Sequence, residues 1–122
     1  MRSVAIIGGG FSGTMVGVHL LRRALRGQTS VDHVLLFERS NRIAGGVAYG
    51  TDDPRHLLNV PAGRMSAFED DPDNFLRWLR TRDPRVSGGS FIPRKTYGEY
   101  IATLFRDTLA AASSAQVVTS VD

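Results

Sequence analysis

Near the start of this chain, a short apolar run leads directly into a glycine-rich turn. Residues 4–7 (VAII) read as a buried strand, and Gly8-x-Gly10-x-x-Gly13 follows them and opens an amphipathic segment. In this order the first glycine allows a tight turn, and the second lets the backbone approach a diphosphate. The third lets the helix pack close on the strand, and the helix N-terminus attracts negative charge. The sequence therefore predicts a dinucleotide-binding βαβ unit.

An acidic residue follows the second apolar run. Residues 33–37 read as a second buried strand, and Glu38 comes directly after it, 25 residues after Gly13. The usual interval is about 20 residues. A helix to about Arg26 and a polar turn over 27–30 account for the difference. A carboxylate at this place accepts the hydroxyls of an adenosine ribose and repels a ribose 2′-phosphate, so we expect FAD or NAD rather than NADP.

A glycine doublet, Gly45-Gly46, begins seven residues after Glu38. Together with Glu38-Arg39 it resembles the doublet that follows the ribose-binding acid in two-dinucleotide flavoproteins. In those proteins the second glycine pair lies beside the FAD diphosphate and ribose. The doublet therefore favours FAD over NAD.

Further motifs extend this resemblance along the chain. They are Gly46-Val47-Ala48-Tyr49, His56-Leu57-Leu58-Asn59-Val60-Pro61, Arg64-Met65-Ser66-Ala67, Asp71-Pro72 with Phe75-Leu76-x-Trp78-Leu79, and Pro93-Arg94-x-x-Tyr97-Gly98-x-Tyr100. In this order they are similar to the bacterial FAD-NAD(P)-binding protein family, distant relatives of flavin-dependent N-hydroxylating and Baeyer–Villiger-type monooxygenases. The resemblance covers about residues 4–109. It implies contacts to the flavin ring between Val47 and Met65, and an NAD(P)H site outside this segment.

The composition limits the compartment and the partners. Hydrophobic residues make up 42% of the chain and charged residues 22%, as in globular domains. No apolar run approaches the ~20 residues of a membrane span, and no secretory signal precedes the first strand. The absence of cysteine excludes disulfides and thiolate metal sites. The net charge of +3 is spread along the chain, which suits a dinucleotide better than a nucleic acid. We expect a cytoplasmic domain without a membrane or nucleic-acid partner.

The pattern also predicts three helices and a third strand. The first helix spans about Gly13–Arg26, with an apolar stripe at helical spacing that consists of Met15, Val16, Leu20, Leu21, Ala24 and Leu25. A second begins at Pro72 with Asp71 as its N-cap, and a third opens with the capping box Thr96-x-x-Glu99 and runs to about Ala112. Residues 116–121 read as the third parallel strand. The third helix carries an apolar stripe that is interpreted as one buried face: Tyr97, Tyr100, Ile101, Leu104, Phe105 and Leu109. The rings of Tyr97, Tyr100 and Trp78 are therefore interpreted as part of the core and not as cofactor contacts.

The expected fold class is α/β: an incomplete Rossmann-like parallel sheet with strands in the order 3-2-1. It consists of the first βαβ unit, a long loop over 40–67, two helices and a third strand. We interpret residues 1–122 as a single FAD-binding domain truncated at its C-terminus, because the second half of a doubly wound fold is not recognisable. The first strand is then an uncapped edge, open to self-association or to a complementary chain.

The leading hypothesis is the FAD-binding N-terminal portion of a flavin-dependent, NAD(P)H-using oxidoreductase of monooxygenase-like type. The alternative is a non-catalytic adenine-dinucleotide-binding module or half of a split assembly, and a plain NAD-dependent dehydrogenase is the third choice. No catalytic residue is recognisable and no metal-ligand spacing occurs, so we expect the chain alone to be inactive. His56 is interpreted as a loop-packing residue. The predicted cofactor-binding residues are Gly8, Gly10, Phe11, Ser12, Gly13, Glu38, Arg39, Gly45, Gly46 and Asn59.

Overall fold

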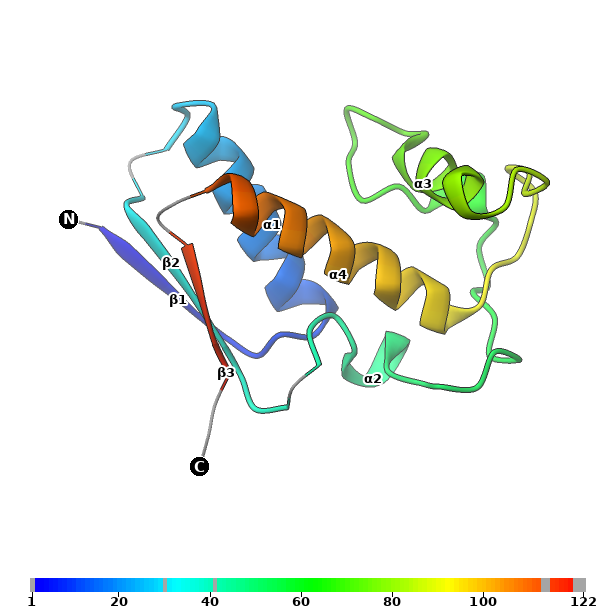
Figure 1. Ribbon diagram of the computed structural model, residues 1–122, viewed down its shortest axis with the longest axis horizontal. Coiled ribbons are helices and arrows are strands. Elements are labelled where there is room, and N and C mark those ends of the chain that lie inside the picture. Colours follow the sequence, from blue (N-terminus) through cyan, green and yellow to red (C-terminus); the bar gives the residue numbers. More distant parts are fainter. Residues whose placement is uncertain (1, 30, 41, 113–114, 120–122) are drawn as a thin grey trace.

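Three parallel strands form the sheet of this protein. The computed structural model describes residues 2–29, 31–40, 42–112 and 115–119. Within them, β1 (Ser3–Ile7), β2 (His33–Glu38) and β3 (Ala115–Thr119) lie in the spatial order β1-β2-β3, as Figure 1 shows. Val4 is paired with Val34, and Phe37 with the backbone of Val118. The predicted parallel sheet and its strand order are confirmed, and residues 120–121 of the expected third strand lie outside the described residues.

Two long helices cover one face of the sheet. The helices α1 (Phe11–Leu25) and α4 (Arg94–Ala111) lie side by side (Figure 1). α1 lies in the connection from β1 to β2 and α4 in the connection from β2 to β3, and both connections lead in the same direction along the sheet. They approach closely at Gly17, where an added Cβ would lie 2.9 Å from the Phe105 ring. Ile6 and Leu36 are buried beneath the helices, whereas the alternate β1 residue Ile7 is 81% exposed. The opposite face of β1 is therefore uncovered in the part of the chain that the structure describes.

The segment between β2 and α4 carries three short elements and an aromatic cluster. These elements are α2 (Gly46–Tyr49), the 3-10 helix η1 (Ala62–Arg64) and α3 (Asn74–Arg82). Phe75 packs against Tyr97 and Tyr100, with ring centroids 4.9 Å and 4.7 Å away, and both tyrosines are buried. Trp78 is half-buried against the same cluster. The prediction that Tyr97, Tyr100 and Trp78 belong to the core is confirmed.

The predicted starts of α3 and α4 are wrong. Asp71 does not cap α3: it closes the preceding turn by accepting the Asn74 N–H, and its carboxylate pairs with Arg77 at 2.7 Å. The N-cap position belongs to Asp73, which makes no side-chain capping bond. Helix α4 begins two residues before Thr96, with Pro93 at its N-cap. The Glu99 carboxylate reaches out to Arg82 at 2.8 Å instead of closing a capping box.

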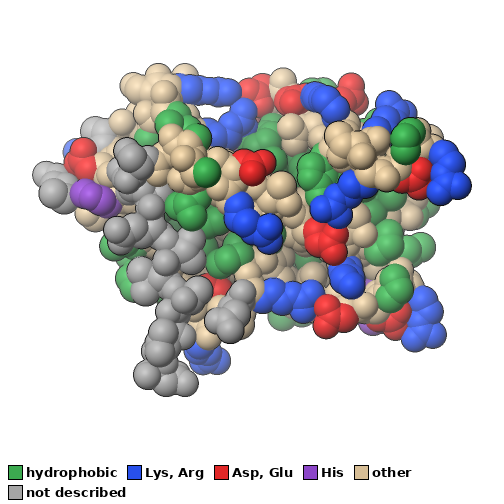
Figure 2. Space-filling view, in the orientation of Figure 1, with side chains coloured by type: hydrophobic (Ala, Val, Ile, Leu, Met, Phe, Trp, Pro, Cys, Tyr) green, Lys and Arg blue, Asp and Glu red, His purple; other side chains and the backbone are tan. Residues whose placement is uncertain are grey.

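The first helix also departs from its predicted pattern. It begins at Phe11, two residues earlier than expected, and Val16 and Leu25 on its predicted apolar stripe are half-exposed. Val18, which the stripe left out, is fully buried beside Leu21. The buried face of α1 thus includes Val18 and Leu21, next to Gly17, which meets Phe105 of α4. Among the described residues, no helix has the length and apolarity needed to cross a membrane. Figure 2 shows basic side chains interspersed with acidic ones over the face that carries α4.

Candidate functional site

The turn after β1 has the geometry that its glycines predict. Gly8 has φ +101°, a conformation that suits glycine, and its N–H donates to the Phe37 carbonyl at 2.8 Å. An added Cβ at Gly13 would lie 1.9 Å from the Gly8 carbonyl oxygen. An added Cβ at Gly10 would meet nothing closer than the Gly46 Cα at 3.8 Å. The turn therefore packs tightly against α1 at Gly13, whereas the space next to the Gly10 Cα is free.

The N-terminus of α1 has no side-chain cap. Gly10 is the N-cap residue, no acidic residue lies in the first turn, and the first intrahelical bond runs from the Thr14 N–H to the Gly10 carbonyl at 3.0 Å. The N–H groups of Phe11, Ser12 and Gly13 therefore have no acceptor within the helix. Because α1 spans 15 residues, its dipole adds to the attraction of an anion at this end.

Glu38 lies against this turn at the end of β2. Its Oε1 accepts a hydrogen bond from the Gly9 N–H at 2.9 Å, and its Oε2 accepts from the Ser40 N–H. These bonds, that from Ser40 first and that from Gly9 second, lower the pKa of Glu38 below its usual value. The side chain therefore stays ionised at neutral pH and is half-buried. Each carboxylate oxygen keeps a further lone pair for another donor, such as a ribose hydroxyl.

The glycine doublet packs directly on the turn. Gly46 has φ +58°, and an added Cβ there would lie 3.3 Å from the Gly10 Cα. The preceding Ala44 is buried, also has a positive φ of 65°, and donates its N–H to the Gly9 carbonyl at 2.7 Å. The structure thus brings together two glycine motifs that are separated by more than thirty residues in sequence.

The start of α1 contacts the predicted flavin-side segment through aromatic rings. The Phe11 ring lies 5.4 Å from Tyr49 and 6.2 Å from Tyr97, measured between centroids. The Tyr97 hydroxyl donates to the Met65 carbonyl at 2.9 Å, and the Tyr100 hydroxyl accepts from the Ala67 N–H at 3.1 Å. Burial raises the pKa of both tyrosines, so these hydroxyls stay protonated. This network fixes the segment that leads from the turn to Met65.

Two predicted site residues lie apart from this cluster of contacts. Asn59 is exposed, and within the described part of the chain no hydrogen bond joins it to the glycine turn. Its segment pairs instead with residues 88–93: the Leu58 N–H donates to Ile92 at 2.8 Å and Leu57 forms a bridge with Pro93. Arg39 is exposed beside Glu38. Their assignment to a cofactor site stays a prediction.

Three contacts of the site were missed from the sequence. Gly9 occupies the unspecified position of the predicted motif, but an added Cβ there would lie 3.0 Å from the Glu38 side chain. Its position in the Gly8-Gly9-Gly10 run was the available signal. No sequence pattern indicates the contacts of Ala44 and Arg42. The Arg42 guanidinium donates to the Gly50 carbonyl and to Asp52, both at 2.9 Å, and these two bonds close the loop that holds the doublet.

The histidines form no metal site in the described residues, where no group of three metal-binding side chains occurs. The Nδ1 of His56 lies 2.7 Å from the Thr51 hydroxyl, and its Nε2 lies 3.9 Å from Asp53. Both contacts are within its own loop, and the side chain is 58% exposed, so His56 lies on the surface of this loop rather than packed inside it.

Comparison with known families decides the class of ligand. A family model described as FAD-NAD(P)-binding matches residues 5–122. The chain belongs to the FAD-NAD(P)-binding family. No curated protein matches it significantly. The family membership supports a flavin or nicotinamide dinucleotide as cofactor, and it confirms the resemblance on which the sequence interpretation depended. An open diphosphate approach at Gly10, the uncapped α1 N-terminus and an ionised Glu38 fit such a ligand.

Proposed function

We propose that this chain binds FAD at the β1–α1 turn, as the FAD-binding portion of a flavin-dependent, NAD(P)H-using oxidoreductase. The observation that carries the proposal is the packing of Gly46 on Gly10: an added Cβ at Gly46 would lie only 3.3 Å from the Gly10 Cα. A nicotinamide dinucleotide needs the first glycine motif and the acid, whereas the second glycine pair beside the first is the flavoprotein feature. The assignment of FAD rather than NAD depends on this contact.

Each predicted residue has a distinct task in this site. The N–H groups of Phe11, Ser12 and Gly13 would receive the diphosphate, because they lack intrahelical acceptors and lie at the positive end of α1. Glu38, with the neighbouring Arg39, would hold the adenosine ribose. Gly45 and Gly46 would contact the diphosphate from the other side, with Gly8 and Gly10 shaping the turn.

The flavin end would lie along the segment from Val47 to Met65, which includes Asn59. This segment is held against α4 by the Tyr97 hydroxyl and against residues 88–93 by backbone bonds, so it is ordered before a cofactor arrives. Bound FAD would supply the redox chemistry, and the residues described here would bind and orient it. The NAD(P)H that reduces the flavin would bind outside these residues. The reaction that we propose for the flavin is monooxygenase-like.

Calorimetric titration of the whole chain with FAD, ADP and NAD tests this function. We expect FAD to bind more tightly than ADP, because the flavin-side segment adds contacts. Glu38→Ala should weaken FAD binding by about 1–3 kcal/mol, the range for losing hydrogen bonds to a charged acceptor. Glu69→Ala, which removes an exposed carboxylate of the loop before α3, is the matched control. Equal affinity of the Glu38→Ala variant and the parent chain would remove Glu38 from the site.

A second candidate is a non-catalytic adenine-dinucleotide-binding module that assembles with another chain. The observation in its favour is the 81% exposure of Ile7 on β1, which pairs only with β2 among the described strands. An apolar edge strand of this kind favours pairing with a further strand. Equal binding of FAD and ADP, together with a dimer or larger assembly in light scattering, would support this candidate over the first.

A further inference from the structure

A short antiparallel ribbon precedes α4. It consists of residues 56–58 and 92–94, which are joined by backbone hydrogen bonds of 2.8 Å and 2.7 Å on either side of an isolated bridge. The same two stretches of chain stay paired further along, where residues 62–63 donate to the carbonyls of residues 88–90 in two bonds of 2.8 Å. These bonds fix the ribbon independently of any ligand.

The two faces of the ribbon differ in character. Side chains alternate along paired segments, so neighbouring residues face opposite sides. Leu58 and Ile92 are buried, with 4% and 7% of their surface exposed. Leu57 and Phe91, which directly precede them, are 47% and 53% exposed. We call this exposed pair, Leu57 and Phe91, the platform, because it offers a leucine and an aromatic ring on the outer face of the ribbon.

Polar groups with spare hydrogen-bonding capacity lie beside the platform. Asn59 follows the ribbon, is exposed, and forms no side-chain hydrogen bond within the part of the chain that the structure describes. The Arg94 Nε donates to the Leu57 carbonyl at 3.1 Å, and no carboxylate of the described residues lies within 4.0 Å of its guanidinium. Because a guanidinium carries five N–H groups, and an amide carries two together with a carbonyl, donors and an acceptor remain for a ligand.

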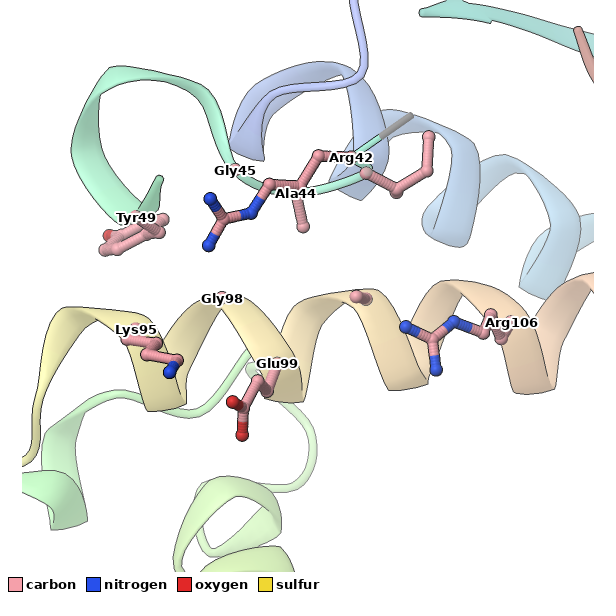
Figure 3. A pocket seen from close by; sticks show the side chains of 10 residues that line it. Arg42, Ala44, Gly45, Tyr49, Lys95, Gly98, Glu99 and Arg106 are labelled. Carbon is pink, nitrogen blue, oxygen red and sulfur yellow. The ribbon is translucent and has the colours of Figure 1, made fainter. Parts of the chain in front are cut away.

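The ribbon and the glycine doublet are held on the same part of α4. Tyr49, the last residue of α2, packs on Gly98, where an added Cβ would lie 3.0 Å from the Tyr49 carbonyl oxygen, and Figure 3 shows Tyr49 next to this stretch of α4. On the ribbon, the Arg94 N–H donates to the His56 carbonyl at 2.7 Å. Gly98 and Arg94 lie one turn apart on α4, which corresponds to about 6 Å along the helix axis. The five-carbon ribityl chain of an FAD whose diphosphate lies at the doublet can span a distance of this order.

We propose that the platform binds the isoalloxazine ring of FAD, with Phe91 stacked on the ring. This inference rests on the proposed function and adds two residues, Phe91 and Arg94, that lie outside the segment expected to contact the flavin. The ring is planar, with an apolar dimethylbenzene end and a polar pyrimidine end that carries an N–H between two carbonyls. The apolar end suits Leu57 and Phe91, since aromatic rings prefer offset stacking. The polar end suits the Asn59 amide and the Arg94 guanidinium, which together offer donors and an acceptor.

A protein partner fits the platform less well than a flavin. The core of a stable protein interface is apolar and depleted of charge, and it takes many residues from each side. Here two apolar side chains lie next to a guanidinium and an amide, a combination that matches one amphiphilic ring. The hollow between residues 42–49 and α4 in Figure 3 is lined by three cations and the Glu99 carboxylate, so it does not suit the apolar end of the ring.

The test is a titration of the uniformly ¹⁵N-labelled whole chain with FAD and, separately, with ADP, followed by amide chemical shifts. We expect Gly8 and Gly10 to shift with both ligands, and Leu57, Asn59 and Phe91 to shift with FAD alone. FAD-specific shifts that leave these three residues out would overturn this inference and leave the proposed function standing. The absence of any saturable shift with FAD would overturn both.

Variants of the platform give the second measurement. Leu57→Ala combined with Phe91→Ala should weaken FAD binding about tenfold and leave ADP binding unchanged, because only contacts to the ring are lost. Phe91→Tyr keeps the aromatic ring and should bind FAD within about twofold of the parent chain. The control is Leu25→Ala on α1, which removes a side chain that is also 53% exposed and should leave both affinities unchanged. An unchanged FAD affinity of the double variant, or an equal loss for FAD and ADP, would overturn the inference.

Discussion

Gly13→Ala tests the close packing of α1 on the turn. An alanine Cβ would lie 1.9 Å from the Gly8 carbonyl oxygen, whereas real Cβ contacts stay above 3.0 Å. The obstacle is backbone, so no rotamer change relieves it, and α1 must move away from β1. Such overpacking costs about 1–3 kcal/mol, and the higher helix propensity of alanine returns at most about 1 kcal/mol. Because the obstacle is a backbone atom, the cost lies at the upper end of this range, and we expect a net loss of about 2 kcal/mol in the free energy of unfolding.

Urea denaturation followed by circular dichroism measures this loss, and Gly10→Ala is the matched control. At Gly10 the nearest atom to an added Cβ is 3.8 Å away and φ is −71°, so alanine fits without strain. Because alanine is a poorer N-cap than glycine, the free energy of unfolding of this variant should fall by up to about 1 kcal/mol, less than the loss expected at Gly13. Its Cβ would nevertheless obstruct the proposed diphosphate approach, so its FAD affinity should fall. A Gly13→Ala variant as stable as Gly10→Ala would refute the close approach.

Three further predictions concern the core and the acid. Gly17→Ala should destabilise the chain by up to about 2 kcal/mol in urea, because the 2.9 Å approach of its Cβ to the Phe105 ring costs about 1–3 kcal/mol and helix propensity returns up to about 1 kcal/mol. Tyr97→Phe should cost about 1–3 kcal/mol by the same assay, since the Met65 carbonyl loses its 2.9 Å donor. Because the pKa of Glu38 is lowered on folding, its ionisation stabilises the folded chain above its ordinary pKa of 4.5, and this stabilisation is lost as the pH falls through the lowered value. Thermal melts of Glu38→Gln and the parent chain should therefore differ at pH 7 and converge in acid; an equal difference at every pH would contradict this linkage.

The local part of the site was predictable because it depends on short-range rules. The turn needs glycine where φ is positive at Gly8 and where α1 meets the strand at Gly13, and both requirements are written in adjacent residues. The position of Glu38 follows from parallel pairing of β1 with β2, whose carboxyl ends meet at one edge. A strand–turn–helix–strand order is therefore enough to bring the acid to the turn.

The misplaced start of α4 depends on contacts that span the chain. The Arg94 N–H donates to the His56 carbonyl at 2.7 Å, next to the Leu57–Pro93 bridge, and this contact fixes the first residue of α4. A capping box read from Thr96 cannot include a partner 38 residues upstream of Arg94. The start of α3 is a local case, because Asp71 forms an ion pair with Arg77, six residues further on, instead of capping the helix. Local propensity predicts that these helices form, whereas contacts outside the helix determine the residue at which each begins.

The two positions of the doublet differ in how strictly they require glycine, because only Gly46 combines a positive φ with a close backbone approach. Gly46 approaches the Gly10 Cα on one side, while an added Cβ at Gly45 would meet the Arg42 side chain at 3.5 Å and the Gly50 Cα at 3.7 Å. Positive φ values at Ala44 and Gly46 let the chain turn sharply at the doublet. A substitution at Gly46 therefore alters both the packing of the turn and any ligand that the turn holds. Only Gly10→Ala, which leaves the packing intact, separates the two effects, and for this reason it is the substitution by which a loss of dinucleotide affinity can be assigned to the site.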